Sequence, residues 1–389
     1  MYEGKLVFAQ VMEHLPLHTL RRSIARFGGD RLAKGFSCQD QFRCMAFGQL
    51  TYRESLRDTI TCLDAQAGKL YHMGIRGRVR RSTLADANEA RDWRIYATFA
   101  AALIAQARTL YADDPLLWEL AGTAYALDTT TIDLALSLFP WAPFERSRGG
   151  IKLHTQMDLR GNIPVLIHID HGRTYDTDIL DVLVPEPGAI YVMDRGYLDF
   201  ARLHRLTQAA AFFVVRARRG LSLSRRLSRQ VDRTSGIICD QDVRPTFEAT
   251  AQKYPQRLRR IRYRDPESGK SLQFLSNNFT LPPLTIAQLY RRRWQIELFF
   301  KWIKQNLRIK SFFGTSPNAV RTQIWIAVSV YVLVAIIKKR LRLAASLYTI
   351  LQMLSVTIFE KTPLDQLLRA AQPSNPTHAL DKQLNLFDL

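Results

Sequence analysis

Residues 290–304 read Tyr290-Arg-Arg-Arg293-Trp-Gln-Ile-Glu297-Leu-Phe-Phe-Lys-Trp-Ile-Lys304 and have the apolar period of an amphipathic helix. Thr285 opens a capping-box pattern just upstream, which predicts that a single helix begins there and runs through the whole segment. At about 100° per residue, Tyr290, Arg293, Glu297 and Lys304 fall within an arc of roughly 60°. One carboxylate thus lies in a file with a phenol and two cations, an arrangement suited to holding a metal ion beside a phosphate backbone.

This spacing resembles the Y-(2)-R-(3)-E-(6)-K signature of DDE transposases of insertion-sequence family four, and it matches all four residue types at all three gaps. That family has two aspartates upstream, each at the end of an apolar strand. Here Asp128 follows the apolar run 124–127, and Asp194 follows the apolar run 189–193. The resemblance extends over about residues 5–340.

The order of the expected elements resembles the ribonuclease-H-like fold of such transposases. A strand ending at Asp128 is followed by a hairpin with strands near 151–159 and 163–169, and then by a helical crossover near 177–184. Next come the strand ending at Asp194, a helix, a further strand and the helix that carries Glu297. The expected fold class is therefore α/β (α+β), with a mixed sheet whose first three strands are antiparallel and which is flanked by helices.

The predicted domains follow the chain in order. We expect a helical N-terminal DNA-binding domain at 1–82, bridging helices at 83–122 that include one long helix from Thr83 to about Tyr111, and a catalytic domain at 123–340 that contains a β-rich insertion at about 217–278. Within the insertion, 231–240 is expected to be a strand, and 259–264 with 271–276 a hairpin. C-terminal helices at 341–372 and a linker with a tail at 373–389 follow. The resemblance implies that the N-terminal domain binds the terminal inverted repeats of the element; a helical dimerisation or packing module is the alternative.

The charge balance points to a polyanionic partner. The chain has 55 Lys and Arg against 35 Asp and Glu, a net charge of +20. Nucleic acid is the first candidate for such a surplus, and a hydrophobic content of 47% argues for a folded protein. Residues 216–264 carry 14 of the basic and only 4 of the acidic residues. By resemblance, this β-rich insertion grips transposon-end DNA, whereas a solvated basic edge is the alternative.

The compartment is predicted to be the bacterial cytoplasm, in association with the nucleoid. The four cysteines form no CxxC pair and no zinc spacing, which is typical of free thiols in a reducing environment. We expect no signal peptide, because the apolar run at 6–9 is too short for one. The most apolar stretch, 324–337, is short for a membrane span and typical of a buried core helix, so no membrane association is expected.

The chemistry requires an activated oxygen nucleophile and stabilisation of charge on the leaving oxygen. Two Mg²⁺ ions about 3.5–4 Å apart can do both, and Mn²⁺ can substitute. By resemblance, Asp128, Asp194 and Glu297 are the catalytic residues and the metal ligands. The further residues expected to contact DNA are Tyr290, Arg293, Lys304, Trp294, Arg195, Arg259, Arg260 and Arg262.

Several of these assignments have a structural alternative. The three polar residues of the signature other than Glu297 are also explained by helix solubility and an internal salt bridge, and Trp294 by a place in the core. His154 and His168 fall on the polar faces of strands and are expected to be satisfied sheet histidines. The insertion contains no tryptophan to stack on a flipped base, so a flipped-base step and a hairpin intermediate both remain open.

The resemblance implies cut-and-paste transposition by a homodimer bound to double-stranded DNA at the inverted repeats and the target. Water cleaves one strand at each end, and the freed 3′-hydroxyl then attacks. The alternatives are a metal-dependent nuclease of the same fold without strand transfer and an inactive, sequence-specific DNA-binding relic. The tail resembles the pentapeptide that binds the bacterial sliding clamp, through Gln383, Leu384, Leu386 and Phe387.

Overall fold

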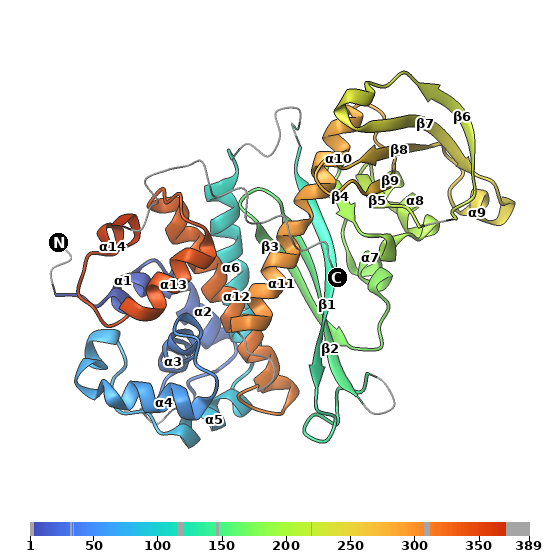
Figure 1. Cartoon of the computed structure of the whole chain (residues 1–389). Coiled ribbons are helices and arrows are strands. Elements are labelled where there is room, and N and C mark those ends of the chain that lie inside the picture. Colours follow the sequence, from blue (N-terminus) through green and yellow to red (C-terminus); the bar gives the residue numbers. More distant parts are fainter. Residues whose placement is uncertain are drawn as a thin grey trace. The chain divides into compact units, whose positions relative to one another are not determined.

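The computed structural model describes residues 4–31, 33, 35–114, 120, 122–144, 148–218, 220–306 and 312–370. These residues form two compact units, whose elements are labelled in Figure 1. Of the described residues, those within 4–113, 132–151 and 300–370 form unit 1, and those within 114–131 and 152–299 form unit 2. Both units are discontinuous in sequence, and the contiguous domain boundaries given above remain a prediction.

Unit 1 is mainly helical. Its α-helices are α1 (Val7–Glu13), α2 (Leu17–Arg26), α3 (Cys38–Leu50), α4 (Leu56–Ala65), α5 (Arg81–Ala90), α6 (Arg94–Tyr111), α12 (Pro317–Arg340), α13 (Leu347–Thr357) and α14 (Leu364–Ala370), with the 3₁₀ turns η1 (Ala67–Lys69) and η2 (Tyr71–Met73). The single long helix predicted to run from Thr83 to Tyr111 is instead the pair α5 and α6. Arg91 is extended, and the Asp92 carboxylate accepts a hydrogen bond from the backbone N–H of Arg94, which favours a new helix start.

Helix α12 is the central core element of unit 1. It is long and apolar enough to cross a membrane, but 89% of its most apolar 18-residue stretch is buried. The helices that it contacts include α3, α5, α6 and α13. The Ser316 side chain caps its N-terminus, and the Tyr111 hydroxyl donates to the carbonyl of Ala335 at 2.9 Å. Because protein covers its apolar surface, α12 is a core helix, as the sequence predicted.

Nine strands form one mixed sheet in the order β3-β2-β1-β4-β5-β9-β8-β7-β6. They are β1 (Ala124–Leu134), β2 (Gly149–Asp158), β3 (Ile163–His171), β4 (Ile190–Met193), β5 (Phe212–Arg216), β6 (Leu223–Arg229), β7 (Ile237–Pro245), β8 (Leu258–Arg264) and β9 (Ser271–Ser276). Strands β1, β4 and β5 are parallel, and the strands from β5 through β9, β8, β7 to β6 are antiparallel. This mixed sheet with its helices confirms the predicted fold class.

Unit 2 also contains helical elements, which pack on both the parallel and the antiparallel parts of the sheet. They are η3 (Asp176–Asp178), α7 (Ile179–Val182), η4 (Arg195–Tyr197), α8 (Phe200–Gln208), η5 (Arg233–Ser235), α9 (Glu248–Lys253) and α10 (Pro283–Arg292), followed by α11 (Trp294–Asn306), which begins in this unit. Tyr191 and Met193 of β4 pack in one core with Leu203 and Leu206 of α8. Ile190 and Val192 therefore face the other side of the sheet, where α10 contacts β4.

Two strand predictions were wrong. Strand β1 does not end at Asp128 but continues to Leu134, because the β-branched residues after Asp128 keep the chain extended and Ile132 is buried. The strand expected at 231–240 lies at 237–245 as β7. Its partner β6 went unpredicted, since an Arg- and Ser-rich strand at the edge of the sheet has no apolar period.

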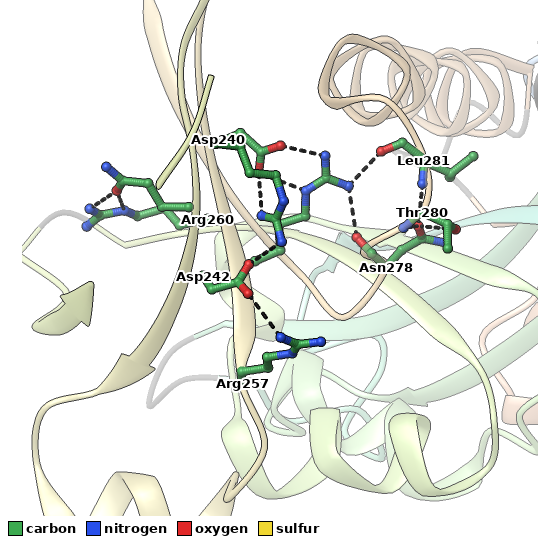
Figure 2. A network of polar contacts seen from close by, with 10 residues as sticks. Asp240, Asp242, Arg257, Arg260, Asn278, Thr280 and Leu281 are labelled. Carbon is green, nitrogen blue, oxygen red and sulfur yellow. Dashed lines mark hydrogen bonds and ion pairs between the residues drawn. The ribbon is translucent and has the colours of Figure 1, made fainter. Parts of the chain in front are cut away.

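Strands β7 and β8 are locked by a buried ion pair, drawn in Figure 2. The Arg259 guanidinium donates to both carboxylate oxygens of Asp240 at 2.8 Å, and the two side chains are 3% and 4% exposed. Its remaining NH₂ group donates to the carbonyls of Asn278 at 3.1 Å and Leu281 at 2.6 Å. Arg259 thus ties the sheet to the loop that leads into α10.

We expect Arg259→Met to destabilise unit 2 by up to about 3–5 kcal/mol, because the buried Asp240 carboxylate loses both hydrogen bonds from Arg259 and keeps the longer contact with Arg229 at 3.3 Å. Urea unfolding of the full chain measures this loss. Arg262→Met is the matched control: it changes an exposed arginine of the same strand and should stay within about 0.5 kcal/mol of wild type. Equal stability of the two variants would contradict the structural role of Arg259.

Candidate active site

The two aspartates occupy neighbouring positions on adjacent parallel strands. Leu127 of β1 pairs with Met193 of β4, so the next residues, Asp128 and Asp194, lie side by side one step further along. Neighbouring strands are about 4.8 Å apart in this direction. The Asp194 carboxylate also accepts a hydrogen bond from the backbone N–H of Gly196 and thereby caps η4.

Because successive side chains of a strand point to opposite faces, Asp128 and Thr129 lie on opposite faces of the sheet. Tyr125 and Leu127 lie in the core beneath α7 and α8, so Asp128 emerges on the opposite face. Thr129 points back toward the core, where its hydroxyl lies 2.8 Å from Nδ1 of His154 and 2.8 Å from the hydroxyl of Tyr197.

The segment that carries Glu297 is not one continuous helix. Helix α10 begins at Pro283 with Pro at its first turn, two residues before the predicted Thr285 cap, and it ends at Arg292. Helix α11 begins at Trp294. At the junction the N–H of Arg293 bonds the carbonyl of Tyr290 at 3.1 Å, three residues back, instead of continuing the four-residue pattern.

Arg293 links the two carboxylates that lie on different elements. One NH₂ group donates to Asp128 Oδ2 at 2.6 Å, and the other donates to Glu297 Oε1 at 2.6 Å. The exposed fractions of the three side chains are 14% for Arg293, 19% for Asp128 and 34% for Glu297. One guanidinium therefore brings Glu297 of α11 to the same site as Asp128 of β1.

The electrostatics of Asp128 reflect both its burial and its neighbours. The pKa of Asp128 is raised to about 6, with burial as the largest cause. Arg293 opposes this rise, and the negative charges of Asp194 and Glu297 add to it. Burial alone would lower the pKa of Arg293, but its contacts with Asp128, Tyr290 and Glu297 raise that pKa above its ordinary value. At neutral pH Asp128 is ionised and paired with the guanidinium.

The donor set has the chemistry that a hard divalent cation requires. Three carboxylates share the site, and oxygen ligands are those preferred by Mg²⁺ and Mn²⁺. Within the part of the chain that the structure describes, however, no three Asp, Glu, His or Cys side chains converge closely enough to hold a metal ion. Arg293 stands between Asp128 and Glu297 instead.

The other residues expected near DNA differ in exposure. Tyr290 is 8% exposed, with its ring centroid 4.7 Å from that of Phe274. Trp294 is half-buried, whereas Lys304 and Arg195 are exposed. Lys304 belongs to unit 1 and the carboxylates to unit 2.

In the insertion, the basic residues divide by strand face. Arg262 is exposed, Arg260 is half-buried and donates to Gln241 Oε1 at 3.1 Å, and the placement of Arg259 leaves that residue no exposed donor for DNA. The predicted clamp-binding residues Gln383, Leu384, Leu386 and Phe387 lie outside the described residues.

The hydrogen-bonded trio Thr129, His154 and Tyr197 was not recognised from the sequence. Burial lowers the pKa of His154 to about 4, so its ring is neutral at pH 7 and serves as a hydrogen-bond partner. The available signal was positional: Thr129 directly follows one aspartate, and Tyr197 lies three residues after the other. The Thr129–Tyr197 bond thus connects the two segments that carry the aspartates.

Comparison with known proteins places this geometry in context. The family model described as "Transposase DDE domain" matches residues 121–333, and a model described as a domain of unknown function matches residues 3–76. The "Putative transposase y4zB" of Sinorhizobium fredii is 31% identical over 299 residues, which cover 76% of this chain and 82% of that protein. The "Probable transposase for insertion sequence element IS5377" of Geobacillus stearothermophilus is 30% identical over 208 residues, which cover 53% of this chain and 54% of that protein.

One solved structure is also similar, a piggyBac transposase synaptic complex with hairpin DNA. It shares 11% sequence identity and has a TM-score of 0.46, and the match covers 95% of this chain and 81% of that one. A similarity of this size adds nothing to the fold assignment made above from the strand order.

The raised pKa of Asp128 predicts a pH dependence of stability. Because its folded pKa of about 6 exceeds its ordinary value of 3.8 in the unfolded chain, this group favours folding below about pH 4. That contribution, up to about 3 kcal/mol, is lost as the pH rises to about 6 and stays lost above it.

Urea unfolding of wild type and Asp128→Asn, without added metal, at pH 4.5 and pH 7.5 measures the effect. Relative to Asp128→Asn, wild type should be more stable at the lower pH than at the higher one. A stability difference between the two proteins that does not change with pH would contradict the raised pKa.

Proposed function

This chain belongs to the family of insertion-sequence transposases with a DDE domain, and from that premise we propose that it catalyses cut-and-paste transposition. In this proposal Asp128, Asp194 and Glu297 are the catalytic carboxylates. Each transposon end is first cleaved by water, and the resulting 3′-hydroxyl then attacks a second phosphodiester. The family membership already implies an enzyme that acts on DNA, and the assignment of residues and steps is the proposal.

One observation carries the assignment of the site. Asp128 and Asp194 follow paired residues of adjacent parallel strands, and the guanidinium of Arg293, which is 165 residues from Asp128 in the chain, joins Asp128 to Glu297. Chance placement among 35 acidic residues does not explain a convergence where the parallel pairing of β1 with β4 ends, and active sites in such sheets usually lie beyond the carboxyl end of the parallel strands.

The three carboxylates would hold Mg²⁺. When bound, two such ions activate the attacking oxygen and stabilise the charge on the leaving oxygen. The protein itself holds the three carboxylates in position. The strand pairing fixes Asp128 beside Asp194, the Thr129–Tyr197 bond braces the two segments, and Arg293 orients Asp128 and Glu297. Arg293 and the exposed Lys304 and Arg195 are then proposed contacts for DNA phosphates.

The β-rich insertion supplies the proposed grip on double-stranded DNA. Arg260, Arg262 and Arg264 occupy alternate positions of β8 and therefore share one face of the sheet. Arg262 and Arg264 are exposed. Their paired residues on β9 are Gln273 and Ser271, both polar, whereas Arg260 pairs with the buried Leu275. The end of this face around Arg262 and Arg264 therefore suits a phosphate backbone of any base sequence.

The partners follow from the reaction. Two transposon ends must be held together, so we propose a homodimer on DNA, with the N-terminal helices of unit 1 binding the inverted repeats. The terminal segment that contains Leu386 and Phe387 is proposed to bind the replication sliding clamp.

A nuclease without strand transfer and an inactive DNA-binding relic are the competing functions. Joining of a 3′-hydroxyl end to a second DNA separates a transposase from a nuclease. The relic would bind DNA without any divalent-metal-dependent cleavage.

We expect Glu297→Gln to reduce metal-dependent cleavage of DNA carrying the element's own ends by about 100-fold or more. Glutamine keeps an oxygen that can accept from Arg293 but loses the negative charge that a metal ligand needs. Gel assays of cleavage, together with gel-shift assays of end binding, measure both properties.

Glu267→Gln is the matched control, because Glu267 forms an exposed ion pair with Arg291 at 2.7 Å and should tolerate the same change. Equal cleavage by wild type and Glu297→Gln would refute the assignment of Glu297. Tight binding without cleavage by any of the three proteins would favour the relic.

For the insertion, Arg262→Gln should weaken DNA binding uniformly across sequences. It should also reduce the slope of log K against log salt concentration by about 1, because one phosphate contact is lost. Fluorescence anisotropy at several salt concentrations tests this. Lys253→Gln removes an exposed cation from α9 and is expected to leave the slope unchanged. Equal slopes for wild type and Arg262→Gln would remove β8 from the DNA interface.

A further inference from the structure

The guanidinium of Arg293 lies between two of the proposed metal-binding carboxylates, where a bound metal ion would otherwise supply the positive charge. Its two NH₂ groups each contact a different carboxylate, Asp128 and Glu297, at 2.6 Å. The Asp194 carboxylate, the third of the set, lies next to Asp128 and accepts from the backbone of Gly196. Three like charges gathered on one side of a sheet repel one another, and the guanidinium is the positive charge that holds two of them together.

The guanidinium is incompletely satisfied in this position. Its Nε–H is buried and has no hydrogen-bond partner in the structure, although both NH₂ groups are paired. A buried donor without an acceptor raises the free energy of this arrangement. The cost of moving Arg293 is therefore smaller when another cation neutralises the carboxylates.

The surroundings of Arg293 allow such a movement. The residue lies at the break between α10 and α11, and its guanidinium carbon is 5.5 Å from the ring centroid of Tyr290. Arginine has a long side chain with several rotatable bonds, so a change of rotamer moves the guanidinium away from the carboxylates.

We propose that Arg293 is an internal stand-in cation. It holds Asp128 and Glu297 in place while the site is empty of metal, and it is released to bind a DNA phosphate when a divalent ion takes over these two carboxylates. This inference rests on the proposed function and adds to it an exchange of partners by a single residue.

Charge balance favours the exchange only when DNA is present. Three carboxylates with one guanidinium leave two negative charges, which one divalent ion neutralises. A second divalent ion makes the site positive, and the guanidinium is then repelled unless a phosphate supplies negative charge. Metal loading and DNA binding are therefore coupled, and each strengthens the other.

The test is the affinity of the full-length protein for Mn²⁺ alone, measured by isothermal titration calorimetry without DNA. Arg293→Met removes the competing cation, so it should bind Mn²⁺ at least about fivefold more tightly than wild type. Arg291→Met is the matched control, since it removes a guanidinium two residues away, on α10, where Arg291 pairs with Glu267. This control should bind Mn²⁺ as wild type does.

Salt separates direct exchange from a general field effect. At about 0.5 M NaCl the long-range influence of a lost positive charge is screened, whereas competition at the carboxylates themselves persists. The tighter binding by Arg293→Met should therefore remain in high salt. Its disappearance there, or equal or weaker Mn²⁺ binding by Arg293→Met, would overturn the proposal.

Stability gives a second readout. Without metal, Arg293→Met should have a lower melting temperature than Arg291→Met, and Mn²⁺ should raise that temperature more for Arg293→Met than for wild type. If Arg293→Met does not fold, Arg293→Lys serves instead. Its single ammonium cannot bridge two carboxylates as a fork does, so its Mn²⁺ affinity should also exceed that of wild type.

Failure of this inference and failure of the proposed function look different. If wild type cleaves transposon ends but Arg293→Met gains no Mn²⁺ affinity, only the stand-in role is refuted. If folded wild type binds no Mn²⁺ and cleaves no DNA in its presence, both are refuted.

Discussion

The parallel pairing of β1 with β4 is the constraint on which the candidate site depends. It aligns Leu127 with Met193, and the following residues on both strands are the two aspartates. Parallel neighbours need a crossover between them, and here the β2–β3 hairpin, η3 and α7 intervene. The apolar face of β4, with Tyr191 and Met193, is covered by α8 and leaves the opposite face for the carboxylates. The alternation of side chains between the two faces of β1 and β4 thus determines both the core packing and the position of the aspartates.

The antiparallel extension of the same sheet shows how one residue type serves two purposes. Along β8, Arg259 points inward and is bound to Asp240, while Arg262 points outward and is exposed. Burial makes Arg259 a structural cross-link, because a desolvated guanidinium requires its carboxylate and carbonyl acceptors. Exposure leaves Arg262 available to a phosphate. Which role an arginine plays is decided by the face of the strand and not by its charge.

The sequence predicted the elements that have a strong local signal. The apolar run before Asp194 became β4, and the pattern at 259–264 and 271–276 became the β8–β9 hairpin. The break at Arg293 had no local signal, since it coincides with ion pairs to a strand 165 residues away. Strand β6 was missed because its side chains are mostly polar and show no alternating apolar pattern. It is a strand because its backbone pairs with β7.

The sequence predicted which residues make up the candidate site, but it did not predict that Arg293 bridges Asp128 and Glu297. Residue spacing grouped Arg293 with Glu297 on one helix face, and the i,i+4 ion pair agrees with that grouping. Spacing says nothing about Asp128 as the second partner, because that contact depends on the tertiary placement of β1 against the α10–α11 junction. The same limit applies to the net charge of +20, since a guanidinium already neutralised by a buried carboxylate adds to the total but attracts no DNA. The charge that can act on a nucleic acid is therefore the exposed remainder, and only the folded structure identifies it.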